Sequence, residues 1–394
     1  MDDEGAWSPW PDLQPELAGM VFCRLLSYGD RLRFRAVCRR WRLAARQQHP
    51  LPPALPWLNL DRITYQSLPD GEVHRIPVPD ELPAGTVCRG SFDGWLLYDR
   101  SEQLECFLRN PISKAKIDLP YHWHCHEAIL PDDEEGRHTM CFHESAVRRI
   151  VVCSPDLVVA AHVYLGLLFH RPSMHSTWSL ADSPSTACNI TLYRGKLYSI
   201  SIYGELFVHE FSHHGHGDHV SSRFEIVIDT TPPEVEGWST HYLVVSCTGK
   251  LLMVRWRWRL PNSYTMRRWR ADELSKAINL DVFEADLEKR HWSEVKEIGD
   301  QALFVGTTCS KALPLPDHGN RIFFLGFDIT QYCLGGIIHG IGDCAYCVYD
   351  MKNGTFIFDN PVSIKRERLS YGSEGNLSQR WRADWFFPSF EPWF

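Results

Sequence analysis

The chain has 394 residues, of which 44% are hydrophobic and 23% charged, and its formal net charge is −8. This length suits two domains or one large one, and the composition excludes disorder, collagen and coiled coil for the bulk of the chain. The negative net charge argues against a general binder of nucleic acid or of anionic membranes.

The ends and the cysteines indicate the compartment. The acidic start, Met1-Asp-Asp-Glu-Gly-Ala, lacks the basic and apolar regions of a signal peptide. The 13 cysteines are odd in number and show no framework spacing, which is typical of reduced thiols. Pro155, Asp156 and His162 interrupt the most apolar stretch, so we expect no membrane span. The sequence therefore predicts a soluble protein of the cytoplasm or nucleus.

Charge divides the chain into two parts. Residues 10–49 hold 8 Arg and 3 acidic residues, whereas the remainder holds 33 basic and 46 acidic residues, a net charge of −13. Between the parts lies His49-Pro-Leu-Pro-Pro-Ala-Leu-Pro56, whose four prolines preclude a continuous helix and favour a stiff connector. We therefore place a small module at residues 10–48, a connector at 49–56 and a large body at 57–394.

The small module reads as three helices. An amphipathic helix is expected over residues 13–26, with Pro15 and Glu16 in its first turn. Tyr28-Gly29-Asp30 is expected to break the pattern, and Asp30 to cap a second helix. A third stretch, residues 37–46, places Trp41 and small apolar residues on one side and several Arg on the other. About forty residues bury little apolar surface, so this unit is expected to need a partner.

Two segments of the module carry a family resemblance. Trp10-Pro-Asp-Leu-Gln-Pro-Glu-Leu17, followed by Asp30-Arg-Leu-Arg-Phe-Arg-Ala-Val-Cys-Arg-Arg-Trp-Arg42, resembles an F-box of the plant type. The family usually has Pro directly after the first Leu, where this chain has Gln14 and then Pro15. An ordinary helical subdomain packed on the body is the alternative. The resemblance implies docking on a Skp-like adaptor through Leu13, Pro15, Leu17, Val21, Leu25, Leu32, Val37 and Trp41.

The body consists of short β-rich runs separated by turn signals. Gly195, Gly249, Gly299 and Gly354 end such signals, and the intervals between them are close to the ~50-residue period of kelch-like blades. Residues 57–394 then predict an all-β propeller of six or seven blades, with a pair of β-sandwiches as the alternative.

The body also resembles a known domain. Gly90-Ser-Phe-Asp-Gly-Trp-Leu96 opens a pattern that continues through Arg194-Gly-Lys-Leu-Tyr198 and Gly249-Lys-Leu-Leu-Met-Val254 and closes with Asp384-Trp-Phe-Phe-Pro388. Order and spacing are similar to the KIB-type β-propeller of plant F-box proteins. The resemblance implies a protein-binding propeller whose target the motifs do not name.

One motif offers a rival chemistry. His209-Glu210-Phe211-Ser212-His213 has the H-E-x-x-H spacing of zinc hydrolases, in which two imidazoles one helical turn apart hold the metal. The segment follows a strand-like run, and residues four apart on a strand lie ~13 Å apart, too far to share a metal without a turn. We expect a blade strand followed by a polar loop containing His214, His216 and His219, with adventitious metal binding as an alternative.

Three further segments resemble functional motifs but are explained by ordinary structural roles. Cys344-Ala-Tyr-Cys347 and His122-Trp-His-Cys-His126 contain metal-ligand types, but loop or buried strand positions suit them at least as well. Arg255-Trp-Arg-Trp-Arg259 alternates like an aromatic RNA-binding strand, and we expect its Trp in a blade core and its Arg on a solvated face. The glycines between 335 and 342 lack the Lys-Ser/Thr ending of a P-loop.

These observations predict a non-catalytic substrate receptor of an SCF-type (Skp/Cullin/F-box) ubiquitin ligase. The F-box would dock on the Skp-like adaptor and through it on a cullin, while the propeller holds a target protein. A non-degradative module that binds and inhibits a kinase-like partner is the alternative, and a zinc hydrolase at residues 209–213 is a remote one. No cofactor, bound metal or nucleic acid is expected.

Overall fold

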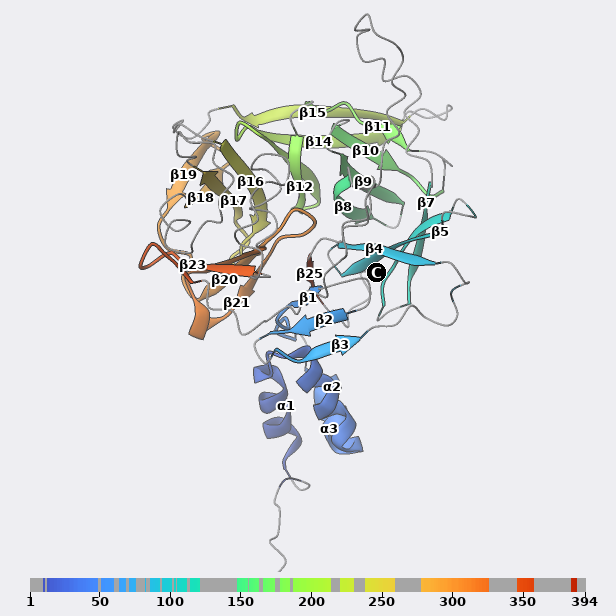
Figure 1. Ribbon diagram of the computed structural model, residues 1–394, viewed down its shortest axis with the longest axis vertical. Coiled ribbons are helices and arrows are strands. Elements are labelled where there is room, and N and C mark those ends of the chain that lie inside the picture. The colour runs from blue at the N-terminus through green and yellow to red at the C-terminus, as the bar shows by residue number, and fades with distance from the viewer. Residues whose placement is uncertain are drawn as a thin grey trace, which may run out of the picture.

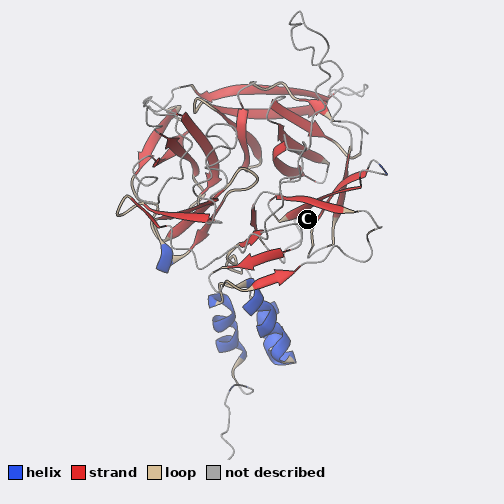
Figure 2. Ribbon diagram, in the orientation of Figure 1, coloured by secondary structure: helices blue, strands red, loops and turns tan. Residues whose placement is uncertain are grey.

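The three-dimensional structure is a computed structural model in which three helices protrude from the edge of a ring of β-sheets, beside β1, β2 and β3 (Figure 1). Helix is confined almost wholly to this protrusion, and the ring is built of strands (Figure 2). The structure describes residues 10, 13–48, 51–59, 64–68, 71–75, 82, 86–92, 94–100, 103, 105–111, 114–120, 147–154, 156–162, 166–173, 178–184, 187–213, 220–229, 238–258, 278–325, 346–357 and 384–387.

The expected three helices are present. They are α1 (Pro15–Arg24), α2 (Tyr28–Val37) and α3 (Arg39–Arg46). Pro15 and Glu16 occupy the first turn of α1, as expected, because the missing N–H of proline costs nothing there and the carboxylate suits the helix dipole.

The expected start of the second helix is wrong. Ser27, not Asp30, is its N-cap, because the Ser27 hydroxyl accepts a hydrogen bond from the Asp30 N–H at 3.4 Å. Tyr28 and Gly29 therefore form the first turn rather than a break, and both are buried. The Asp30 carboxylate instead pairs with Arg33 at 3.0 Å.

The helices share a small core of their own. Phe22 and Phe34 lie with ring centroids 5.2 Å apart, and alanines on α1 and α3 let the helices approach closely. Only five residues of this core are buried: Ala18, Phe22, Phe34, Ala44 and Ala45. A core this small leaves much of the apolar surface of the module uncovered.

The described strands form six sheets, which are the blades of the propeller. Blade 1 contains β1 (Trp57–Asn59), β2 (Thr64–Ser67), β3 (Val73–Arg75) and β25 (Asp384–Phe386). Blade 2 contains β4 (Val87–Phe92), β5 (Trp95–Arg100), β6 (Glu105–Arg109) and β7 (Lys116–Leu119). Blade 3 contains β8 (Val147–Ser154), β9 (Leu157–His162), β10 (Gly166–His170) and β11 (Ser179–Leu180).

The remaining blades follow in chain order. Blade 4 contains β12 (Ala187–Tyr193), β13 (Lys196–Ser201), β14 (Leu206–His213) and β15 (Val220–Ile228). Blade 5 contains β16 (Trp238–Val245), β17 (Leu251–Trp258), β18 (Ile278–Asp286) and β19 (His291–Val295). Blade 6 contains β20 (Gln301–Val305), β21 (Lys311–Pro314), β22 (Arg321–Leu325), β23 (Tyr346–Asp350) and β24 (Thr355–Ile357). The propeller prediction is confirmed with six blades, and the β-sandwich alternative is wrong.

The two ends of the body close the ring in blade 1. Strand β25 pairs antiparallel with β1, so Trp57 lies opposite Phe386 and Leu58 opposite Trp385. The Ser91 hydroxyl of β4 in blade 2 donates to the Trp385 carbonyl at 3.1 Å, which ties the closing strand to the next blade. Closure leaves the ring without an open edge between its first and last blades.

The four predicted turn glycines all have positive φ, which favours glycine because it has no Cβ. Gly195 and Gly249 join the first two strands of blades 4 and 5, so their 54-residue interval is the true blade period. Gly299 precedes β20 and Gly354 joins β23 to β24, so the other two intervals compare unequal positions. The propeller prediction was therefore correct although two of its three intervals matched the blade period by coincidence.

A polar tie joins four blades near the ring centre. The buried Arg149 of β8 donates to the Asn189 side-chain oxygen on β12 at 3.0 Å and to the Ser310 hydroxyl of blade 6 at 3.5 Å. The same Asn189 oxygen accepts from the Leu243 N–H of β16 at 3.0 Å. Because buried polar groups are costly unless paired, these bonds favour one register of neighbouring blades.

Candidate functional site

The helical module exposes large apolar side chains. Leu17 is 47% exposed, Leu32 44% and Val37 60%. Pro15 and Val21 are also exposed, so five of the eight residues proposed from the sequence as adaptor contacts lie open to solvent. Exposed large apolar side chains on so small a unit are candidates for contact with a partner protein.

The other three proposed residues lie differently. Leu13, Leu25 and Trp41 are half-buried and pack against the core shared by the helices. The Trp41 ring stacks on Phe34 with centroids 4.4 Å apart, and Trp10 meets it edge-on at 6.5 Å. Trp41 therefore packs against the core of the module. The sequence pattern placed Trp41 on the apolar side of α3 but did not show whether that side faces the core or a partner.

The sequence reasoning left two exposed apolar side chains out of the set. Met20 is 55% exposed on α1, and Leu43 is 46% exposed on α3. Met20 stands three residues after Leu17, so the helical period was a signal that could have included it. Leu43 lies between Arg42 and Ala44, and no comparable signal marks it. We define the helical apolar surface as Leu17, Met20, Val21, Leu32, Val37 and Leu43.

Cations accompany this surface. Arg39, Arg40, Arg42 and Arg46 on α3 are all exposed. Arg31 differs, because it is buried and its burial lowers the pKa of its guanidinium. A partner that offered apolar pockets and acidic groups would match the module, since electrostatic complementarity favours association and rejects basic partners.

The H-E-x-x-H segment lies on β14, as expected. His209 is buried, its ring nitrogen lies 2.7 Å from the Ser199 hydroxyl, and burial lowers its pKa to about 4. Glu210 points outward to Lys196 at 3.5 Å. Residues alternate in direction along a strand, so this segment lacks the helical geometry of a zinc hydrolase. The loop residues His214, His216 and His219 lie outside the described residues.

The other segments weighed as possible ligand sites, and set aside, fall mostly outside the described part of the chain. This applies to residues 122–126, to Cys344 and to the glycines between 335 and 342, whereas Cys347 is buried in β23. Within the described residues, no group of three or more His, Cys, Asp or Glu is placed to hold a metal ion. No described helix is long and apolar enough to cross a membrane.

The predicted solvated face of the Arg-Trp strand is wrong for Arg255 and Arg257, whereas Arg259 and the side chain of Trp258 lie outside the described part of the structure. Trp256 packs in the core between blades, as expected, but Arg255 is only 7% exposed. Arg255 and Arg257 both bind Asp281, at 3.0 and 2.7 Å. Both faces of a blade's second strand are covered by neighbouring blades, so period-two alternation separates two interiors here rather than a core from solvent.

The described part of the propeller also exposes large apolar side chains. Those on the described strands and turns are Val73, Leu180, Ile202, Tyr203, Ile226 and Ile357. Three of them, Ile202, Tyr203 and Ile226, belong to blade 4. The sequence predicted a target-binding face on the body but no residues for it, so these exposed side chains cannot be compared with a prediction.

Comparison with known proteins finds similarity for both the helical module and the propeller. A family model described as KIB1-4 beta-propeller matches residues 65–359. An Arabidopsis thaliana F-box protein, At4g17565, is 24% identical over 381 residues, covering 88% of this chain and 89% of the relative. Another from the same plant, F-box protein At2g05970, is 24% identical over 417 residues, covering 97% and 96%. Among solved structures, a Trichoderma reesei family AA12 enzyme aligns with a TM-score of 0.24 and 11% identity, covering 40% of this chain and 42% of that one.

Proposed function

Because the chain belongs to the KIB1-4 beta-propeller family, we propose that it is the substrate receptor of an SCF-type ubiquitin ligase. Two relatives named F-box proteins cover 88% and 97% of this chain, which implies a Skp-like adaptor as partner in general. We assign residues 10–48 to the F-box, 49–56 to the connector and 57–394 to the propeller. The F-box docks on the adaptor, and through it on a cullin, while the propeller holds a target.

The helical apolar surface carries this proposal. Each of its side chains keeps roughly half of its area in water, so covering one contributes about 1 kcal/mol at the usual transfer energy. Six such side chains together contribute about 6 kcal/mol towards meeting the costs of association. The module has only five buried core residues to set against this exposed area, so a partner also stabilises it.

The proposed mechanism is proximity. A receptor that holds a target beside a ubiquitin-charged enzyme raises the effective concentration of the target lysines without making or breaking bonds itself. The strand position of His209 and the outward ion pair of Glu210 fit this non-catalytic role.

Co-purification tests the proposal. The full-length protein is expressed with a Skp-like adaptor, and the adaptor recovered per receptor is quantified for the wild type, Leu17→Asp and a matched control, Ile357→Asp. Both substitutions place a charge on an exposed apolar position, one on α1 and one on blade 6. We expect adaptor with the wild type and the control and a loss of at least about tenfold with Leu17→Asp. A wild-type protein that recovers no adaptor would refute the proposed function.

A further inference from the structure

Helix α2 contributes to two different surfaces. Its later turns expose Leu32 and Val37, whereas its first turn packs on blade 1. Tyr28 is 5% exposed and meets Trp57 of β1 edge-on, with ring centroids 5.6 Å apart. Tyr28 thus belongs to the same buried cluster as Phe386 of the closing strand.

Hydrogen bonds fix the chain on either side of this contact. The buried guanidinium of Arg31 donates to the Leu25 carbonyl at 2.7 Å and to the Pro53 carbonyl at 3.4 Å. The Leu55 N–H donates to the Leu26 carbonyl at 2.8 Å. Two of these bonds, from Arg31 to Pro53 and from Leu55 to Leu26, therefore join the helical module to the connector without following the covalent path through α3.

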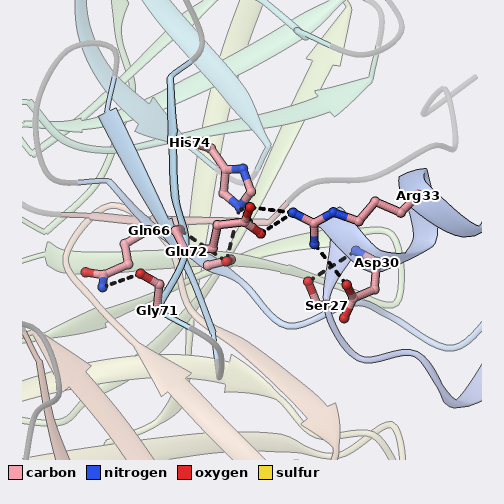
Figure 3. A network of polar contacts seen from close by, with 8 residues as sticks. Ser27, Asp30, Arg33, Gln66, Gly71, Glu72 and His74 are labelled. Carbon is pink, nitrogen blue, oxygen red and sulfur yellow. Dashed lines mark hydrogen bonds and ion pairs between the residues drawn. The ribbon is translucent and has the colours of Figure 1, made fainter.

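A network of polar contacts also joins α2 to blade 1 (Figure 3). Arg33 of α2 bridges Asp30 on its own helix and Glu72 beside β3. His74 of β3 stacks on Trp57 at 4.4 Å, and its ring nitrogen lies 3.1 Å from the Ser67 hydroxyl. Exposed ion pairs contribute at most about 1 kcal/mol, so the buried aromatic contact and Arg31 account for most of the stability of this joint.

We infer that the first turn of α2 locks the helical module and blade 1 into one rigid body. The orientation is set by the contact of Tyr28 with Trp57 and by the bond of Arg31 to Pro53, and stiffness of the chain between Gln48 and Pro53 is not needed for it. The functional consequence of this joint rests on the proposed function. A fixed angle between adaptor and propeller presents the same lysines of a bound target to the ubiquitin-charged enzyme in every encounter. A positioned lysine reacts far more often than one on a flexible tether.

Pulsed electron-electron spin resonance tests the rigidity without any partner. Spin labels are attached through noncanonical amino acids at the exposed positions Arg46, on α3, and Glu288, after β18. A flexible connector of about eight residues has an end-to-end distance of roughly 15 Å, so a tethered module would give a distribution of comparable width. We expect a single narrow distribution instead.

Two variants separate the joint from the connector. Insertion of Gly-Ser-Gly-Ser between Gln48 and His49 lengthens the connector and should leave the distribution unchanged. The double variant Tyr28→Ala with Arg31→Met removes the contacts and should broaden it several-fold, while Arg39→Ala, an exposed change on α3, should not.

The outcomes discriminate clearly. A broad wild-type distribution, or broadening by the insertion, would overturn the rigid joint, and both results remain decisive if the double variant does not fold. A folded double variant with an unchanged distribution would also overturn it. Failure of adaptor binding with a narrow distribution would refute the proposed function alone.

Discussion

Docking and folding should respond to different residues of the helical module. Val37 is 60% exposed, and complete burial of a valine side chain contributes about 1.5–3 kcal/mol, so an adaptor that covers Val37 gains about 1–2 kcal/mol from it. Val37→Asp should therefore weaken adaptor binding by at least about 5- to 30-fold, and by more if the carboxylate is buried unpaired. The stability of the unbound protein should change by less than about 0.5 kcal/mol.

Trp41→Ala should behave in the opposite way. Replacing a fully buried aromatic residue by alanine costs about 3–5 kcal/mol, and Trp41 is half-buried with its ring stacked on Phe34, so we expect a loss of about 2 kcal/mol. That loss makes opening of the helices about 30-fold more frequent. Any fall in adaptor binding then follows from the loss of structure.

Hydrogen exchange and calorimetry separate the two effects. Exchange of the amides of α1, α2 and α3 is measured by mass spectrometry on the full-length proteins, and adaptor affinity by titration, with Arg39→Ala as the control. Val37→Asp should keep wild-type protection and bind weakly, whereas Trp41→Ala should lose protection. A protected Trp41→Ala protein that no longer binds would make Trp41 an adaptor contact, and normal binding by Val37→Asp would remove Val37 from the docking surface.

Three further results are expected. Burial lowers the pKa of His209 and His241 to about 4, so between pH 6.5 and 4 the unfolded chain binds more protons than the folded chain. The melting temperature should therefore fall as the pH decreases from 6.5 towards 4, and a melting temperature independent of pH would contradict this. Glu210→Gln should leave stability and the zinc content after mild chelation unchanged, and stoichiometric, chelation-resistant zinc lost in the variant would contradict the strand assignment. Residues 50–394 expressed alone should give a β-rich spectrum but a lower melting temperature than the full chain, because Trp57 loses its cover by Tyr28; an equal value would argue against the joint.

The sequence alone determined the local structure and the family. Helical spacing predicted α1 and α3, and short β-rich runs bounded by glycine turns predicted strands such as β12 and β17. Two sets of motifs pointed to a plant F-box protein with a propeller. These features depend on neighbours a few residues apart, and a side chain's preference for helix, strand or turn acts over that distance. The prediction of where α2 begins was wrong because Ser27 and Asp30 are both residue types that cap helices well.

Tertiary structure alone decided which residues are covered. Arg255 alternates with tryptophans as a solvated residue would, yet blade packing buries it against Asp281. Ring closure joins Ser91 to Trp385, 294 residues away, and fixes the blade number at six among the described strands. Tyr28 reads as a turn residue but anchors the helices to blade 1 through Trp57. Burial depends on surfaces supplied by distant parts of the chain. The periodicity of one segment carries no information about which distant surface packs against it.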